Sequence, residues 1–351
     1  MERKFRKTLI GAAAFALGFG LAASAYGAVS GACSDCHTMH ASQDGVASTP
    51  NNQLLTVAGC GGCHAQGIAN AGSLDALSTY PQVTADTTGW AASKETELAG
   101  GFFDTTTGAS ASAMHNPSDI SAQIPTDTLT APPGFNAGGI WPGSGTLSCS
   151  GTNGCHDTGG HHLNATGDNE TTGATVATSY RFLKLAVRGY EDGDYEFSST
   201  TADHNQYYGV AQTKGTAGTT TGTMSNFCAG CHDNFHTMTE ITGDSTGGTG
   251  TWWLRHPVDF DLTDATGSTE YANYTTYDLT VPVASDVVSQ PDTTIQDSLV
   301  GATTANDAVV MCLSCHRAHG SRHADLLRWD YTAIEAGVSG TAGCLVCHNT
   351  K

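Results

Sequence analysis

Near its C-terminus the chain reads Cys312-Leu313-Ser314-Cys315-His316, and this short pattern, which recurs along the sequence, decides the fold. All 12 cysteines of the 351 residues fall into six pairs, and a histidine follows the second cysteine of every pair. The pairs are Cys33/Cys36, Cys60/Cys63, Cys149/Cys155, Cys228/Cys231, Cys312/Cys315 and Cys344/Cys347. Five motifs are C-x-x-C-H and the third is C-x5-C-H. The repetition predicts six sites of one kind.

The spacing suits covalent attachment of haem. Two thiols three residues apart on a helical turn lie on one side and can form thioethers to the two vinyl groups of one haem. The residue that follows then projects under the ring, where histidine is a proximal iron ligand. Zinc sites also use C-x-x-C, but they do not need a histidine after each pair. We expect six covalently bound haem c groups, with the proximal ligands His37, His64, His156, His232, His316 and His348.

The third motif needs a longer loop between its two thiols. Asn153-Gly154 supplies a turn there, since both residues favour turn conformations. A disulfide or a single thioether is the alternative at this motif.

The histidines outside the motifs are numerous enough to give every iron a second axial imidazole, because the chain has 15 histidines. His40 and His319 each follow a proximal histidine by three residues, so they share its helical face and can reach only a neighbouring haem. The adjacent motifs at Cys60 and Cys344 are the expected acceptors.

Proline shapes two further candidates, His256 before Pro257 and His115 before Asn116-Pro117, because it biases the preceding backbone away from helix. The predicted distal ligands are His40, His115, His162, His204, His256 and His319, with His161 and His236 as alternates.

The N-terminus has the pattern of a secretory signal peptide. Basic residues among the first seven precede an apolar run from Leu9 to Ala23 and small residues at Ala23-Ser24-Ala25. We therefore expect residues 1–27 to be removed and residues 28–351 to form a single hexahaem unit that is exported through the periplasm. No later apolar run approaches the ~18 residues of a membrane span.

Composition limits the fold and the partners. A net charge of -19 argues against nucleic acid, which needs basic residues to neutralise its phosphates. The 43 glycines favour loops over regular elements. We predict a mostly irregular multihaem cytochrome c with short helices at the haem motifs, a few short strands and a core built around six stacked haems. Strands are expected within Tyr180–Tyr190 and Tyr277–Val283, and a short helix near His323–Tyr331.

These residues resemble the OmcS-type outer-surface hexahaem cytochromes of metal-reducing bacteria. The likeness rests on CSDCHTMH at 33–40, CAGCHDNFH at 228–236 with Leu254-Arg255-His256-Pro257 downstream, CLSCHRAH at 312–319 and the haem-bearing C-terminus at 344–351. The resemblance implies bis-histidine haems in a continuous stacked chain, with protomers joined head to tail into an extracellular nanowire. It also implies other multihaem cytochromes as electron donors and extracellular acceptors such as metal oxides.

Three functions compete on the sequence alone. The favoured one is a non-enzymatic electron conduit that polymerises into a filament at the cell surface. A monomeric periplasmic or outer-surface electron shuttle is the alternative. A multihaem reductase fits less well, because it needs an iron with an open position, whereas all six proximal residues are histidine and distal candidates exceed the number required.

Overall fold

The structure of the chain is a computed structural model, and it describes only part of the residues. They are residues 37, 42–43, 46–47, 60, 64, 83–84, 100–103, 112–120, 131–135, 146–157, 161, 179–190, 204–212, 220–237, 240–242, 252–254, 256, 258–262, 274, 277–288, 308–335, 337, 340 and 342–348. The predicted signal peptide lies outside this part of the chain.

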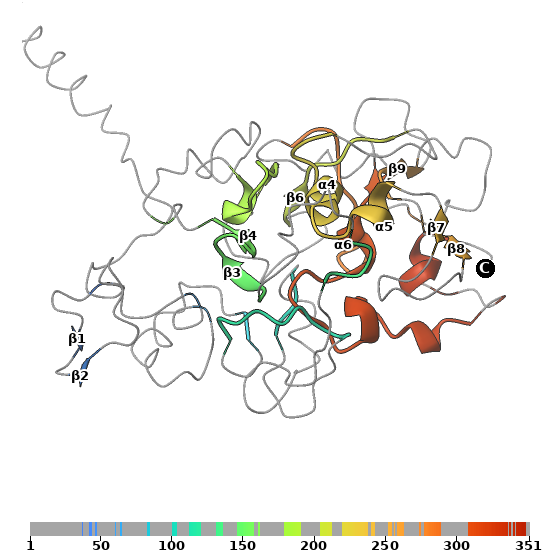
Figure 1. Ribbon diagram of the computed structural model, residues 1–351. Coiled ribbons are helices and arrows are strands. Elements are labelled where there is room, and N and C mark those ends of the chain that lie inside the picture. Colours follow the sequence, from blue (N-terminus) through green and yellow to red (C-terminus); the bar gives the residue numbers. More distant parts are fainter. Residues whose placement is uncertain are drawn as a thin grey trace, which may run out of the picture.

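Regular elements are short throughout the described residues (Figure 1). The strands are β1 (Ser42–Gln43), β2 (Val46–Ala47), β3 (Ser148–Ser150), β4 (Gly154–His156), β5 (Gly189–Tyr190), β6 (Gln206–Tyr207), β7 (Glu240–Thr242), β8 (Trp252–Leu254), β9 (Phe260–Asp261) and β10 (Val309–Val310). The helices are α4 (Met224–Ala229), α5 (Asp233–Thr237) and α6 (Cys312–Cys315), with 3-10 turns η3 (Tyr180–Phe182), η6 (Ala324–Leu326), η7 (Tyr331–Ala333) and η8 (Gly343–Val346). The prediction of a mostly irregular chain with a few short elements is confirmed.

The strands form two-stranded pairs only, as far as the described residues go. Four pairs are antiparallel and one, β3 with β4, is parallel. Short helices at the haem motifs are also confirmed for three of them, because α4 contains Cys228, α6 spans Cys312–Cys315 and η8 contains Cys344.

Three local predictions need correction. Residues 180–190 begin with η3 and reach strand conformation only in β5, because Arg181 and Phe182 have positive φ and cannot continue a strand. Residues 277–283 form no strand pair. The chain makes a turn there, in which Thr280 N donates a hydrogen bond to Asp278 Oδ1. Around His323–Tyr331 the chain forms two separate 3-10 turns in place of a helix. They are η6, where Asp325 is also left-handed, and η7, which begins at Tyr331.

Two apolar clusters lie on either side of β10. Val309 belongs to a cluster with Tyr207 and Met224, whereas Val310 packs in a second cluster with Tyr274. Successive side chains of a strand point to opposite sides, so this one strand serves both clusters. Met311 follows it and is also buried, and α6 begins at the next residue. The fifth motif is therefore anchored between the two clusters, with α6 against α4 (Figure 1).

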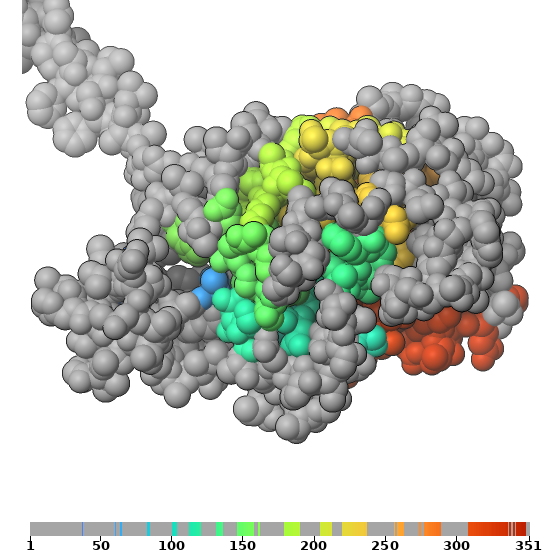
Figure 2. All heavy atoms as spheres, in the orientation of Figure 1, coloured from blue at the N-terminus to red at the C-terminus, as the bar shows by residue number. Residues whose placement is uncertain are grey.

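Segments far apart in the sequence lie side by side around the motifs. The 112–120 segment meets the 146–157 segment on one face (Figure 2), where Ser118 N donates to Leu147 O at 2.7 Å. Asn234 N likewise donates to Gly134 O at 2.8 Å. Among the described residues, no helix has the length and apolar character that crossing a membrane requires.

Candidate haem sites

All six predicted proximal histidines and nine of the twelve cysteines belong to the described part of the chain. Those nine cysteines are free thiols, so no disulfide competes for them. Cys33, Cys36, Cys63, His40 and His162 lie outside the described residues.

Four pairs of imidazole rings have nearly the same centroid separation. The pairs and their ring-centroid separations are His64–His161 at 6.2 Å, His115–His232 at 6.1 Å, His156–His319 at 6.4 Å and His256–His348 at 6.1 Å. Each pair joins one motif histidine to a histidine from another segment. When two imidazoles bind one metal ion from opposite sides, each metal–nitrogen bond is about 2.0 Å and each ring centre lies about 1.1 Å beyond its nitrogen. The two ring centroids are then about 6.2 Å apart. The rings are therefore spaced to bind one iron between them.

Backbone carbonyls hold five of the imidazoles in one tautomer, four from these pairs and that of His316. In each case the ring Nδ1 donates to a backbone carbonyl oxygen. The pairs are His115 to Ala318 O (2.7 Å), His156 to Arg181 O (2.9 Å), His232 to Pro133 O (2.7 Å), His316 to Asp325 O (2.6 Å) and His319 to Gly101 O (3.2 Å). A carbonyl oxygen only accepts, so Nδ1 carries the proton and Nε2 keeps its lone pair. A hydrogen bond of this kind is the usual support of an imidazole that binds metal through its other nitrogen.

Burial also keeps the imidazoles neutral. It lowers the pKa of His232 to about 4 and that of His319 to about 3. It lowers the pKa of His115, His156 and His316 as well. The neutral ring is the form that donates its lone pair to a metal, so the sites suit iron near neutral pH.

The structure places His319 opposite His156, not near the Cys344 motif as the sequence predicted. The cause is backbone pairing over a long range. His319 N donates to Gly100 O at 2.6 Å, and Ser321 N donates to Ala113 O at 2.8 Å. These bonds draw the turn after the fifth motif towards the third motif.

The other predicted distal histidines lie in different surroundings. His115 faces His232 and His256 faces His348. His161, an alternate, is the described residue that faces His64. His204 is buried, and its ring stacks on Tyr277 at 3.6 Å between centroids.

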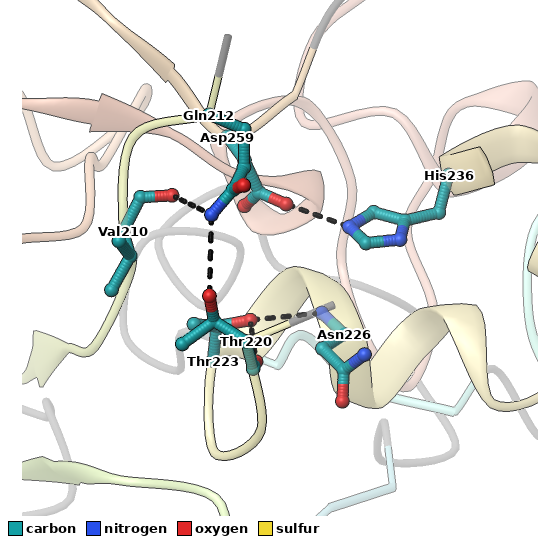
Figure 3. A network of polar contacts seen from close by, with 7 residues as sticks. All are labelled: Val210, Gln212, Thr220, Thr223, Asn226, His236 and Asp259. Carbon is teal, nitrogen blue, oxygen red and sulfur yellow. Dashed lines mark hydrogen bonds and ion pairs between the residues drawn. The ribbon is translucent and has the colours of Figure 1, made fainter. Parts of the chain in front are cut away.

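His236, the second alternate, points elsewhere. Its Nε2 lies 2.6 Å from Asp259 Oδ2, and both side chains are 3% exposed (Figure 3). The Asp259 backbone is fixed in turn, because its N–H donates to Val310 O and its carbonyl accepts from Gln212 N, both at 2.7 Å. The nitrogen that would bind iron is thus committed to a carboxylate. No pattern in the sequence marks Asp259 as its partner.

The sulfurs of the second to the sixth motif form a series of neighbours. The thiols of Cys60 and Cys149 interact with each other, and so do those of Cys228 and Cys312. Electrostatic interaction links Cys155 with Cys231 and Cys315 with Cys344. Motifs that follow one another in the sequence therefore lie next to one another in space.

The third motif closes its longer loop with the parallel pair β3–β4, in which Ser148 aligns with Gly154. Gly154 N donates to Gly151 O at 3.2 Å, and Gly151 has φ 82°, which glycine adopts without strain. Lys184 Nζ donates to the carbonyls of Gly151 and Thr152. The extra residues thus form a fixed loop between the two cysteines.

A family model described as "Doubled CXXCH motif" matches residues 305–351. These are c-type haem attachment motifs. The matched segment holds the fifth and sixth motifs, Cys312 to His316 and Cys344 to His348. The motif indicates covalent binding of c-type haem by this part of the chain.

Two solved structures are similar to the chain. One is described as the "Outer Membrane Cytochrome S Filament from Geobacter Sulfurreducens", at 19% identity over 90% of this chain and 88% of that one, with a TM-score of 0.41. The other is described as "Cryo-EM of the OmcS nanowires from Geobacter sulfurreducens", at 20% identity over 91% of each chain, with a TM-score of 0.40. A comparison with curated proteins finds no match.

Proposed function

We propose that the chain is a hexahaem c-type cytochrome that conducts electrons and has no catalytic site. The observation that carries the proposal is the set of four imidazole pairs at 6.1–6.4 Å, each with one histidine of a C-x-x-C-H or C-x5-C-H motif. Haem, when bound, supplies one-electron transfer at its iron. The chain's residues hold and orient that group.

Each part of a site has a physical task. The motif cysteines fix the group covalently, and the paired imidazoles take both axial positions. The carbonyl oxygens of Ala318, Arg181 and Asp325 orient the rings and raise their basicity through the Nδ1–H bonds. An iron with two protein ligands has no position for a substrate, so the pairs favour a conduit over a reductase.

The neighbouring sulfurs of successive motifs support transfer from site to site along the chain. Polymerisation is the further part of the proposal, and it rests on the sequence resemblance to OmcS-type cytochromes. A head-to-tail interface that does not close generates a helical filament. The proposed protein is exported, forms such a filament at the cell surface and passes electrons from other multihaem cytochromes to extracellular acceptors such as metal oxides. A monomeric shuttle is the alternative.

The first experiment measures haem content and ligation of the mature protein, made in a host that attaches haem c. Intact mass should give six haems per chain, and electron paramagnetic resonance should give low-spin ferric signals without a high-spin component. Fewer haems, or a substantial high-spin fraction, would overturn the hexahaem conduit.

Electron microscopy of the same preparation and of cell-shed material then separates the two assembly states. Filaments built only of this chain would support the nanowire. Discrete particles that stay within the cell envelope would replace it with the shuttle.

A further inference from the structure

One backbone device occurs twice, at residues 180–184 and 324–328, and we name each copy a clip. In both clips two consecutive residues other than glycine adopt left-handed backbone. They are Arg181 (φ 48°) and Phe182 (φ 57°) in the first clip, and Asp325 (φ 60°) and Leu326 (φ 56°) in the second. Left-handed conformation is unfavourable for such residues. Leu185 and Ala186 form a further pair of this kind directly after the first clip, but the contact with a motif histidine described next belongs to the two clips.

The first left-handed residue of each clip turns its carbonyl towards a motif histidine. Arg181 O accepts from His156 Nδ1 at 2.9 Å, and Asp325 O accepts from His316 Nδ1 at 2.6 Å. The clips thus support the imidazoles of the third and fifth motifs by the same contact.

The remaining contacts are also matched. Phe182 O and Leu326 O each accept, at 2.7 Å, from the residue that follows the motif histidine. The basic residue that ends each clip donates its N–H to the carbonyl of the second cysteine, from Lys184 to Cys155 O at 3.0 Å and from Arg328 to Cys315 O at 2.9 Å. The two sites therefore share one frame, and they differ in the side chains attached to it.

The largest difference lies at the first left-handed position, where one clip has a cation and the other a carboxylate. Arg181 is half-buried and fixed, since its Nε donates to Tyr180 Oη at 3.0 Å. Its charge acts on both rings of the pair His156–His319. The Asp325 side chain is exposed, and its charge acts on His316.

Other charges adjoin the two motifs. Asp157 follows His156 and the buried Arg317 follows His316, so each of them opposes the clip charge at its own motif. At the third motif, Lys184 adds a cation at the loop, while the Asp119 carboxylate accepts from Cys149 N at 2.6 Å on the thioether side. At the fifth, Arg328 opposes Asp325, but its Nε donates to the carbonyls of Leu313 and His316. The charge of Asp325 acts on His316 more strongly than that of Arg328 does.

We infer that this clip position sets the reduction potential of the haem it supports, with Arg181 raising the potential at the third motif and Asp325 lowering it at the fifth. An oxidised haem carries one more positive charge than a reduced one, so a nearby cation favours the reduced state and a nearby anion favours the oxidised state. The inference rests on the proposed function. Both residues are positioning residues, because they act through the histidine they hold.

The test uses the full haem-loaded chain and four variants: Arg181→Gln and Asp325→Asn, with Arg181→Lys and Asp325→Glu as controls that keep the charge. The left-handed carbonyl contact is expected to survive, since no variant introduces proline or a β-branched residue and asparagine tolerates this backbone. Potentiometric titration followed by visible absorption gives the six reduction potentials.

Arg181→Gln should move one haem to lower potential and Asp325→Asn should move one to higher potential. At a fixed potential we expect about a three- to tenfold change in the ratio of oxidised to reduced haem, where tenfold corresponds to 59 mV for one electron. Because Asp325 is exposed, its effect should shrink as salt is raised, whereas that of Arg181 should persist. The charge-keeping controls should leave the potentials unchanged.

Unchanged potentials in both charge-removing variants, with six low-spin haems retained, would overturn the inference and leave the conduit intact. Loss of low-spin haem from the parent chain would instead overturn the proposed function. If Arg181→Gln does not fold, Asp325→Asn changes an exposed side chain only and still decides the matter by itself. A shift of the opposite sign in that variant also contradicts the inference.

Discussion

His115 donates a hydrogen bond from Nδ1 to the carbonyl oxygen of Ala318 at 2.7 Å, across 203 residues of sequence. Ala318 directly precedes His319, whose own carbonyl accepts from His115 N at 3.0 Å. His115 faces the histidine of the fourth motif, and His319 faces that of the third. The candidate distal ligands of two neighbouring sites therefore share one short turn as their support.

Replacing His115 by alanine should remove one axial ligand and convert one haem from low spin to high spin, because the described chain offers His232 no other imidazole at this distance. Electron paramagnetic resonance of the purified ferric protein measures the change. The matched control is His236→Ala, in which all haems should stay low spin. That variant should instead lower the free energy of unfolding by about 1–3 kcal/mol, since it leaves a buried carboxylate without its partner. A high-spin signal in the control would show that His236 is a ligand after all.

The pairing of His319 with His156 is tested by counting low-spin haems in double variants. Substituting alanine at 319 and 156 together should cost one low-spin haem, as each single change does, because both rings serve one site. Substituting alanine at 319 and 256 together should cost two, because His256 serves the sixth motif. If the double variant at 319 and 256 lost only one low-spin haem, His319 would belong to the Cys344 motif.

Two glycines hold the turn that carries His319. A Cβ at Gly320 would lie 2.4 Å from Phe102 O, and one at Gly101, where φ is 69°, would lie 2.0 Å from Gly320 O. Gly101→Ala and Gly320→Ala should each lower the free energy of unfolding by about 1–3 kcal/mol, as overpacking does. Chemical denaturation followed by haem absorption measures it.

Gly151 is the control for this prediction, because its φ of 82° is as unusual but nothing lies within 4 Å of a built Cβ. Gly151→Ala should show only the cost of left-handed backbone, about 1 kcal/mol. Equal losses at 101 and 151 would mean that backbone conformation, and not the close approach of the two segments, accounts for the effect.

Acid should destabilise the fold before it displaces the ligands. Burial lowers the pKa of His319 from 6.5 to about 3 and that of His232 to about 4. As the pH falls below 6.5, the unfolded chain takes up protons at these histidines and the folded chain does not, so the free energy of unfolding decreases. Denaturation at pH 7 and pH 5 should show the decrease, while the low-spin absorption without denaturant stays constant.

His319→Met removes one of these titrating groups and keeps an axial donor. Its free energy of unfolding should therefore fall less between the two pH values than that of the parent chain. An equal fall in both proteins would place the acid sensitivity elsewhere.

The sequence predicted the attachment chemistry well because that chemistry is local. Two thiols and an imidazole within one turn need no tertiary information, and the doubled CXXCH match at 305–351 agrees with the fifth and sixth motifs. His115 and His256 were also selected, through the proline that follows each of them within two residues, and each lies 6.1 Å from a motif histidine between ring centroids.

Partner choice was not predictable, because it depends on contacts between distant segments. The position of His319 three residues after a motif histidine suggested a neighbour in sequence, whereas the bond from His319 N to Gly100 O directs it to the third motif. His236 was an alternate ligand, but its Nε2 lies against the buried carboxylate of Asp259, which follows β8 in the sequence. The strand expected within 180–190 is confined to β5 for a related reason, since Arg181 adopts left-handed backbone and presents its carbonyl to His156.

The shared turn at 318–320 bears on how the protein matures. Translation runs from the N-terminus, so Cys149, Cys155 and His156 are made well before His319. Until the 318–320 turn is made, His156 lacks the imidazole that it faces and His115 lacks the Ala318 carbonyl that orients its ring. The last quarter of the chain thus completes imidazole pairs whose other members were made earlier, and a product truncated before it would lack both His319 and the support of His115.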